Sequence, residues 1–148
     1  MLRKNIVAII PARGNSKRIP GKNYKIFNGK PIIANTIEKL KKSRIFDRII
    51  VSTDSKKIAS ISKRCGAEVP FRRPVKISDH HTGTGEVIAH AVSWMQEQQW
   101  QPKLVCCIYA TAIFFTIEDL KKGMENKAGE YSRDIRMLKE EVKHLEKQ

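Results

Sequence analysis

The sequence has no apolar run long enough to cross a membrane. A transmembrane helix needs about 20 consecutive apolar residues, and no stretch of the 148 residues approaches that length. The first residues also lack the long apolar stretch of a secretory signal. We therefore expect a cytoplasmic protein with no membrane partner.

Cysteine is scarce as well. The chain holds three cysteines, Cys65, Cys106 and Cys107, an odd number without the spacing of metal ligands. Cys106 and Cys107 are adjacent in an apolar segment, so the alternation of a strand would send them to opposite faces. This pattern indicates reduced, structural thiols and excludes a disulfide framework.

Acidic residues are few in the first half of the chain. Residues 1–75 hold 19 Lys and Arg against four Asp and Glu, whereas residues 76–148 hold 10 against 11. The overall net charge of +14 is thus concentrated in the first half. This asymmetry predicts an anionic partner, and charge alone leaves open whether that partner is nucleic acid or a phosphorylated small molecule.

The apolar residues form segments that alternate between two periodicities. Apolar, β-branched runs predict strands at residues 6–11, 48–54 and 103–110. Helical spacing predicts helices at residues 31–43, 55–69, 83–99 and 116–124, the second of which ends at Gly66 before a short strand. The alternation predicts an α/β, Rossmann-like three-layer sandwich with a mostly parallel sheet. Ligands bind such sheets at the carboxyl ends of the strands, here residues 12–23, 52–54 and 109–115.

Residues 128–148 follow a different pattern. Five apolar residues are spaced by four, three, four and three positions: Tyr131, Ile135, Leu138, Val142 and Leu145. This spacing predicts a C-terminal amphipathic helix. Two heptads leave open whether the helix docks on its own domain or forms the seam of a homodimer.

The first strand runs into a basic loop in the stretch VAIIPARGNSKRIPGKN, residues 7–23. Gly14 and Gly21 enclose six residues and Asn23 follows Lys22, so the phosphate loop G-x-x-x-x-G-K-[ST] is excluded by spacing and by the missing hydroxyl. The dinucleotide fingerprint G-x-G-x-x-G is also absent, and Asp54 at the tip of the second strand is therefore not assigned a ribose contact.

A phosphate-binding loop of another type remains. The two glycines let backbone N–H groups approach an anion, and Arg13, Lys17 and Lys22 could neutralise a triphosphate. A solvated basic loop is the alternative on composition alone. The position of the loop at the tip of the first strand favours the anion site.

At this point the sequence resembles a known family. IIPARGNSKRIPGKN resembles the opening signature of the sugar nucleotidyltransferases, specifically of the acylneuraminate cytidylyltransferases. The resemblance continues through NGKPIIANTIE, FDRIIVSTDS, GAEVPFRRP, HTGT and CCIYATA, and the last segment is most similar to the branch that activates pseudaminic acid, a bacterial relative of sialic acid. It implies a nucleotidyltransferase-like domain at residues 1–127, with residues 128–148 as a helical tail of unrelated sequence.

The resemblance also implies a reaction and a set of site residues. CMP would pass from CTP to the anomeric hydroxyl of an acidic nine-carbon sugar, with release of pyrophosphate and with Mg²⁺ as cofactor. Arg13 and Lys22 would be catalytic. The residues that would bind CTP are Arg13, Ser16, Lys17, Lys22, Asn23, Arg73, Thr84, Tyr109, Ala110 and Thr111.

The chain departs from the family pattern in three places. Members of the family are longer, and their magnesium ligands lie beyond the point where this chain ends, which implies a truncated chain without metal ligands of its own. Ile113 replaces a family proline after YATA, which would alter the turn there. Asp79 and His80 stand where an acidic pair is expected, and the adjacent His80 and His81 point apart on an extended segment, so they predict no metal site.

Two other functions remain open on the sequence. One is an inactive nucleotide-binding remnant whose tail mediates oligomerisation, and the other is a basic nucleic-acid-binding domain. Trp94 and Trp100 lack the interleaved basic and aromatic residues of a platform that stacks on single strands. This absence disfavours nucleic acid as the partner.

Overall fold

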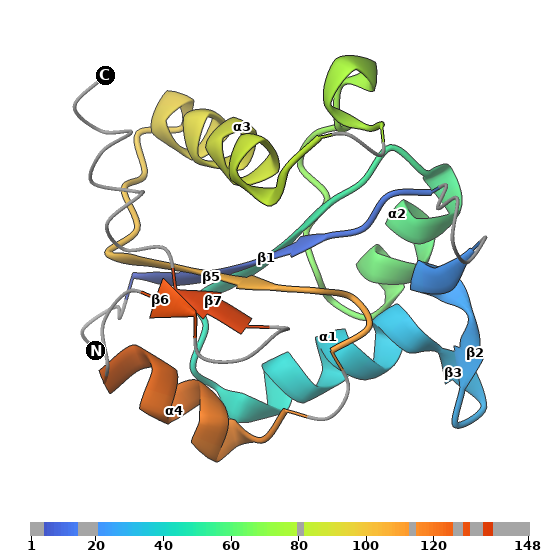
Figure 1. The fold of residues 1–148 in the computed structure, drawn as a ribbon, viewed down its shortest axis with the longest axis horizontal. Helices are drawn as coiled ribbons and strands as arrows, with labels where there is room; N and C mark the ends of the chain where they lie inside the picture. Colours follow the sequence, from blue (N-terminus) through green and yellow to red (C-terminus); the bar gives the residue numbers. More distant parts are fainter. Residues whose placement is uncertain are drawn as a thin grey trace.

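The protein is described here by a computed structural model, which covers residues 5–14, 21–79, 82–112, 115–125, 129–130 and 135–137. A five-stranded sheet forms its centre, with helices on both faces (Figure 1). The order β4-β1-β5-β7-β6 joins Arg48–Ser52, Ile6–Pro11, Leu104–Ile108, Ile135–Met137 and Gly129–Glu130. β1 pairs in parallel with β4 and β5, whereas β7 is antiparallel to β5 and β6. The predicted α/β sandwich with a mostly parallel sheet is confirmed.

Each face of the sheet has its own apolar core. α1 (Ile32–Ser43), α2 (Lys56–Arg64) and α4 (Ile117–Glu125) cover one face, and α3 (Thr84–Glu97) covers the other (Figure 1). Along β1, Ala8 and Ile10 belong to the first core, whereas Val7 and Ile9 belong to the second. A strand that is buried on both faces has no polar alternation, which is why its sequence reads as a continuous apolar run.

The cysteines lie as predicted. Cys106 belongs to the core under α1 and Cys107 to the core under α3, and both side chains are buried. All three cysteines are free thiols. Burial raises the pKa of the Cys106 thiol, so this group stays protonated and packs as a small apolar side chain.

Local capping explains where two helices begin. The Ser55 hydroxyl accepts a hydrogen bond from the Ile58 N–H at 3.2 Å at the start of α2. At α4, the Thr116 hydroxyl accepts from the Asp119 N–H at 3.0 Å, and the Asp119 carboxylate accepts from the Thr116 N–H at 2.9 Å. This reciprocal capping holds the pKa of Asp119 below its usual range.

The structure corrects the predicted C-terminal helix. Gly129–Glu130 and Ile135–Met137 are strands, and Ile135 lies opposite Ile108 in an antiparallel pair with β5. Without β7, β5 would expose a row of unpaired N–H and C=O groups, and satisfying them outweighs a helical periodicity of only two heptads. The helix prediction is wrong for these residues, and residues 128, 131–134 and 138–148 lie outside the described residues.

Short elements connect this sheet to the loops at its carboxyl edge. Two 3-10 turns are formed, η1 by Lys22–Tyr24 and η2 by Val75–Ile77, and a hairpin joins β2 (Ile26–Phe27) to β3 (Lys30–Pro31). The hairpin leads directly into α1 (Figure 1). Among the helices in the described part of the chain, none is sufficiently long and apolar to cross a membrane.

Arg48 joins the two tryptophans to the start of β4. Its Nε and Nη2 donate to the two carboxylate oxygens of Glu68 at 2.8 and 2.5 Å. The Cζ atom of the guanidinium lies 4.6 Å from the centre of the Trp100 ring and 5.5 Å from that of the Trp94 ring. Both rings also pack against the core under α3. The tryptophans therefore have a structural role in this fold.

Replacing Arg48 by alanine is expected to lower the free energy of unfolding by about 1 to 2 kcal/mol, because a partly exposed ion pair and two ring contacts are lost together. Urea unfolding followed by tryptophan fluorescence measures this change. Lys42→Ala, which removes an exposed cation from α1, is the matched control and is expected to leave the unfolding midpoint unchanged. Equal midpoints for the two variants would contradict a stabilising role for Arg48.

Candidate functional site

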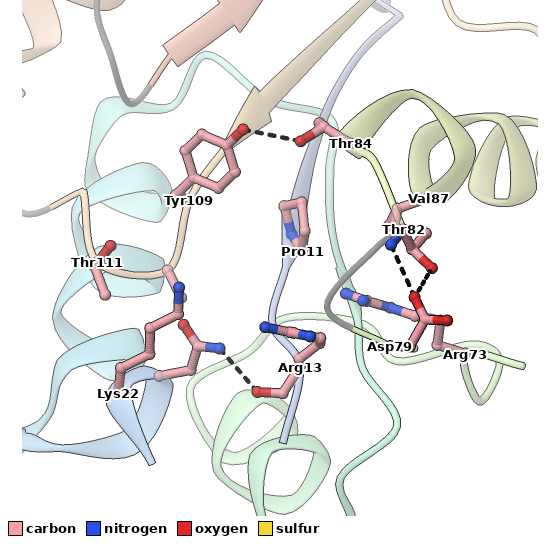
Figure 2. Close-up of a pocket in the computed structure, with 12 residues that line it drawn as sticks. Pro11, Arg13, Lys22, Arg73, Asp79, Thr82, Thr84, Val87, Tyr109 and Thr111 are labelled. Carbon is pink, nitrogen blue, oxygen red and sulfur yellow. Dashed lines mark hydrogen bonds between the residues drawn. The ribbon is translucent and has the colours of Figure 1, made fainter. Parts of the chain in front are cut away.

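A pocket of about 400 Å³ lies at the carboxyl ends of β1 and β5 (Figure 2). Because parallel strands end at the same edge of a sheet, the loops after β1 and β5 meet there, together with the start of α3. The lining residues are Pro11, Arg13, Lys22, Asn23, Arg73, Asp79, Thr82, Thr84, Val87, Tyr109, Ala110 and Thr111.

The pocket brings together eight of the ten residues that the sequence proposes for CTP. They are Arg13, Lys22, Asn23, Arg73, Thr84, Tyr109, Ala110 and Thr111. Ser16 and Lys17 lie outside the described residues, as do Ile113 and the two adjacent histidines. The binding role of each residue stays a prediction, while their convergence on one pocket is a finding.

Arg13 and Lys22 lie on one side of the pocket and project into it from the two ends of the basic loop (Figure 2). The Asn23 side chain, which is buried, donates to the Arg13 carbonyl at 2.8 Å and so closes the loop. Gly21 immediately before η1 has φ +67°, a left-handed conformation that favours glycine. Arg13 and Lys22, which flank this loop, are thereby held at the pocket.

Arg73 supplies a third cation and is only 4% exposed. Its Nε donates to the Ser52 hydroxyl at 3.2 Å and its Nη2 donates to the Ser52 carbonyl at 2.8 Å. Burial lowers the pKa of Arg73, Asp54 raises it and Arg13 lowers it, yet a guanidinium remains protonated at neutral pH. Since a guanidinium carries five N–H donors, the contacts with Ser52 leave donors for an anion in the pocket.

The opposite side of the pocket is lined by hydroxyl groups. Thr84, the first residue of α3, and Tyr109, directly after β5, form a hydrogen bond at 2.9 Å between their hydroxyl oxygens (Figure 2). Beside Arg73, the Asp79 carboxylate accepts from the Thr82 N–H at 2.8 Å and from its hydroxyl at 2.7 Å (Figure 2). The pocket therefore has a cationic side at Arg13 and Lys22 and a neutral, hydrogen-bonding side at Thr84 and Tyr109.

Sequence reasoning missed a role for Asp54. Its Oδ1 accepts from the Gly14 N–H at 2.8 Å, so the tip of β4 fixes the start of the basic loop. A Cβ on Gly14 would lie 2.9 Å from the Cβ of Ser55, which shows how closely the loop packs there. The available signal was position, because Asp54 lies just beyond the carboxyl end of β4, the strand next to β1.

The fold and the pocket together define an α/β protein with a pocket rich in basic side chains at the carboxyl edge of its sheet. Comparison with known proteins specifies the family. The sequence model described as cytidylyltransferase matches residues 7–147, and this chain belongs to the cytidylyltransferase family. The resemblance inferred from the first loop is thereby confirmed. The match extends past residue 127, into the segment expected to be unrelated, and the boundary at that residue stays a prediction.

Curated relatives share this similarity over part of their length. The chain is 41% identical over 122 residues to the pseudaminic acid cytidylyltransferase of Campylobacter jejuni serotype O:2, which covers 82% of this chain and 52% of that protein. It is 48% identical over 83 residues to the CMP-N,N'-diacetyllegionaminic acid synthase of Legionella pneumophila, covering 56% of this chain and 34% of that protein. The chain thus spans about half the length of the first relative and about a third of the length of the second.

Solved structures show the same fold. A CMP:2-keto-3-deoxy-manno-octonic acid synthetase complexed with CTP matches with a TM-score of 0.66 at 21% identity, over 82% of this chain and 46% of that one. A cytidylyltransferase from Leptospira borgpetersenii matches with a TM-score of 0.71 at 19% identity, over 98% of this chain and 63% of that one. At these identities the likeness extends to the fold alone.

Proposed function

We propose that this protein binds CTP in the pocket and transfers CMP to the anomeric hydroxyl of a nonulosonate, an acidic nine-carbon sugar such as pseudaminic acid. The observation that carries the proposal is the convergence of Arg13, Lys22 and Arg73 with the hydroxyls of Thr84 and Tyr109 in one pocket. A nucleoside triphosphate has the same division into an anionic and a neutral part. Membership in the cytidylyltransferase family and the names of the curated relatives support CTP and a nonulosonate as the two substrates.

In this proposal the triphosphate lies between Arg13 and Lys22, and the nucleoside extends toward Thr84 and Tyr109. Charge-assisted hydrogen bonds from the cations hold the phosphates in place. Hydroxyl groups can donate to and accept from a base or a ribose, which gives the neutral end its selectivity. Attachment at both ends would align the α-phosphorus for attack.

The reaction needs no protein nucleophile. The anomeric oxygen forms a new bond to the α-phosphorus, and the bond from that phosphorus to the bridging oxygen breaks. Pyrophosphate departs with the electron pair of the broken bond, and the proton of the sugar hydroxyl passes to solvent water. Arg13 and Lys22 would stabilise the negative charge that develops on the phosphate oxygens. Holding the two reactants in line supplies the remaining acceleration.

Mg²⁺ enters this proposal only with the nucleotide. Within the part of the chain that the structure describes, no three His, Cys, Asp or Glu side chains are grouped to hold a metal ion. Of the pocket-lining residues that the structure describes, Asp79 alone carries a carboxylate. These residues do not amount to a protein site for the ion, and Mg²⁺ usually takes phosphate oxygens and water as well. We assign no catalytic step to Mg²⁺. The cytoplasmic location and the homodimer that the sequence suggested also stay predictions.

A calorimetric titration of the purified chain with CTP in the presence of Mg²⁺ tests the binding step, with ATP as the control. We expect saturable binding of CTP that is at least about tenfold tighter than that of ATP, because base-edge hydrogen bonds discriminate strongly. Release of pyrophosphate with pseudaminic acid would then test the transfer. A folded sample that binds neither nucleotide would contradict the proposal and favour an inactive remnant.

A further inference from the structure

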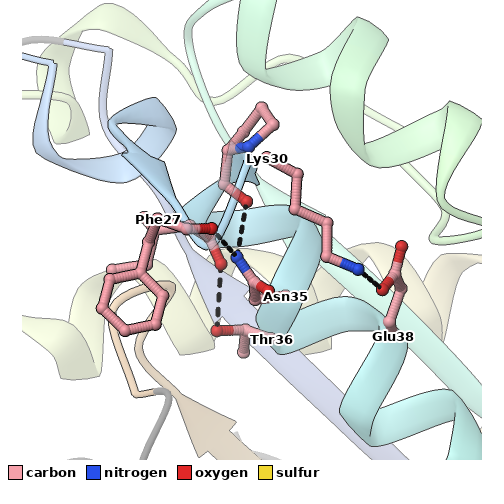
Figure 3. Close-up of polar contacts among 7 residues, drawn as sticks. Phe27, Lys30, Asn35, Thr36 and Glu38 are labelled. Carbon is pink, nitrogen blue, oxygen red and sulfur yellow. Dashed lines mark hydrogen bonds and ion pairs between the residues drawn. The ribbon is translucent and has the colours of Figure 1, made fainter.

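Thr36 is a fully buried residue outside the pocket whose hydroxyl contacts the pocket wall. It lies on α1, and its Oγ1 is 2.7 Å from the carbonyl oxygen of Ala110, a lining residue that is 74 positions away in the sequence. The same oxygen is 3.4 Å from the Ile32 carbonyl of its own helix (Figure 3). A hydroxyl has one proton to donate, and the shorter distance assigns it to Ala110.

The residues beside Thr36 attach α1 to the chain segment between η1 and this helix. Asn35 donates to the Phe27 carbonyl at 2.9 Å and to the Pro31 carbonyl at 3.3 Å (Figure 3), and the Ile32 N–H donates to the Lys25 carbonyl at 2.8 Å. These contacts attach α1 to the segment that directly follows η1, which carries Lys22 and Asn23. The first turns of α1 thus connect the cationic side with the loop after β5.

We propose that Thr36 is a positioning residue that sets the spacing between the Lys22 side of the pocket and the wall formed by residues 109–111. This inference rests on the proposed function, because only a ligand that contacts both sides depends on their spacing. Threonine is not favoured inside a helix on local grounds, and a buried hydroxyl is costly unless it is paired. The long-range bond to Ala110 provides a reason for a hydroxyl at this position.

The test compares a ligand that spans the pocket with one that occupies only its cationic side. Thr36→Val keeps the shape of the side chain and removes the donor, whereas Thr36→Ser keeps the donor. Calorimetry gives the Kd of CTP and of inorganic tripolyphosphate for each folded variant. We expect Thr36→Val to weaken CTP by about tenfold while tripolyphosphate changes by less than about twofold, and Thr36→Ser to remain near the parent protein.

Ser62 provides a matched control. It is also fully buried in a helix, and its hydroxyl donates to the Ile58 carbonyl at 2.7 Å, away from the residues that line the pocket. Ser62→Ala is expected to lower the Tm and leave both Kd values unchanged. If Thr36→Val does not fold, Thr36→Ala takes its place, with the same expected loss for CTP.

Three results would overturn the inference while leaving the proposed function intact. These are an unchanged CTP affinity in Thr36→Val, an equal loss for CTP and tripolyphosphate, and an equal effect of Ser62→Ala on CTP. If the parent protein itself binds no CTP, the proposed function fails, and this inference fails with it. The parent titration therefore separates the two failures.

Discussion

Replacing Lys22 by alanine is expected to weaken CTP binding by about 30-fold to 100-fold. The ammonium group reaches into the pocket from the first position of η1, next to Arg13 (Figure 2). A charge-assisted hydrogen bond to phosphate contributes about 1.5 to 3 kcal/mol, and the lost Coulomb attraction adds to it. Calorimetric titration with CTP in the presence of Mg²⁺ measures the change.

The loss should scale with the number of phosphates on the ligand. Arg13→Ala is expected to behave in the same way, and both variants should bind CMP with a smaller loss than CTP. Lys25→Ala is the control, because Lys25 is an exposed cation three positions further on that does not line the pocket. Unchanged CTP affinity in both Lys22→Ala and Arg13→Ala would exclude the assignment of the phosphate site.

Much of the fold was predictable because burial on both faces of a parallel sheet leaves a strong sequence pattern. The runs IVAIIP and LVCCI predict strands even when the strands that pair with them are not known. The alternation of side chains along a strand also predicted that the adjacent cysteines lie on opposite faces of the sheet. The caps at Ser55 and Thr116 are equally local, since each depends on residues three positions apart. Local rules therefore determine most of the elements.

The C-terminal segment was mispredicted because its conformation depends on a partner far away in the sequence. Its periodicity favours a helix, while Ile135–Met137 pairs with the exposed edge of β5. An unpaired strand edge exists only once the sheet has assembled, so it cannot be predicted from the sequence of the C-terminal segment alone. The same limit applies to any element whose stability comes mainly from long-range pairing.

The convergence of the proposed site residues on one pocket was predictable from the sequence, whereas the contacts that hold them there were not. The loop after the first strand and the segment after β5 share an edge by topology, so their convergence follows from the fold class. Asp54 and Thr36 act through contacts that span 40 and 74 positions, and each joins a side chain to a backbone group of another segment. The spacing of residues in the sequence does not predict such long-range hydrogen bonds, which are identified only in the folded structure.

Replacing Arg73 by lysine is expected to weaken CTP binding by about tenfold to 100-fold, although the formal charge is kept. The guanidinium contacts the Ser52 hydroxyl and carbonyl and still presents N–H groups to the pocket, whereas an ammonium has three donors on a single atom. If the lysine ammonium binds the Ser52 oxygens, it no longer contacts the anion. If it binds the anion, the Ser52 oxygens lose their hydrogen-bond donor. Arg72→Lys, at an exposed neighbour outside the pocket lining, is the matched control.

The pH dependence of this variant separates a contact with CTP from a loss of packing. Burial lowers the pKa of Arg73, but a guanidinium keeps its proton, so parent affinity should stay flat from about pH 7 to about pH 9. A lysine starts from a much lower pKa; burial, the largest influence on the residue at this position, would lower that pKa further, Asp54 would raise it and Arg13 would lower it. The lysine then loses its proton as the pH rises, and CTP affinity of Arg73→Lys should fall across this range. A flat profile with parent-like affinity would show that Arg73 serves the fold rather than the ligand.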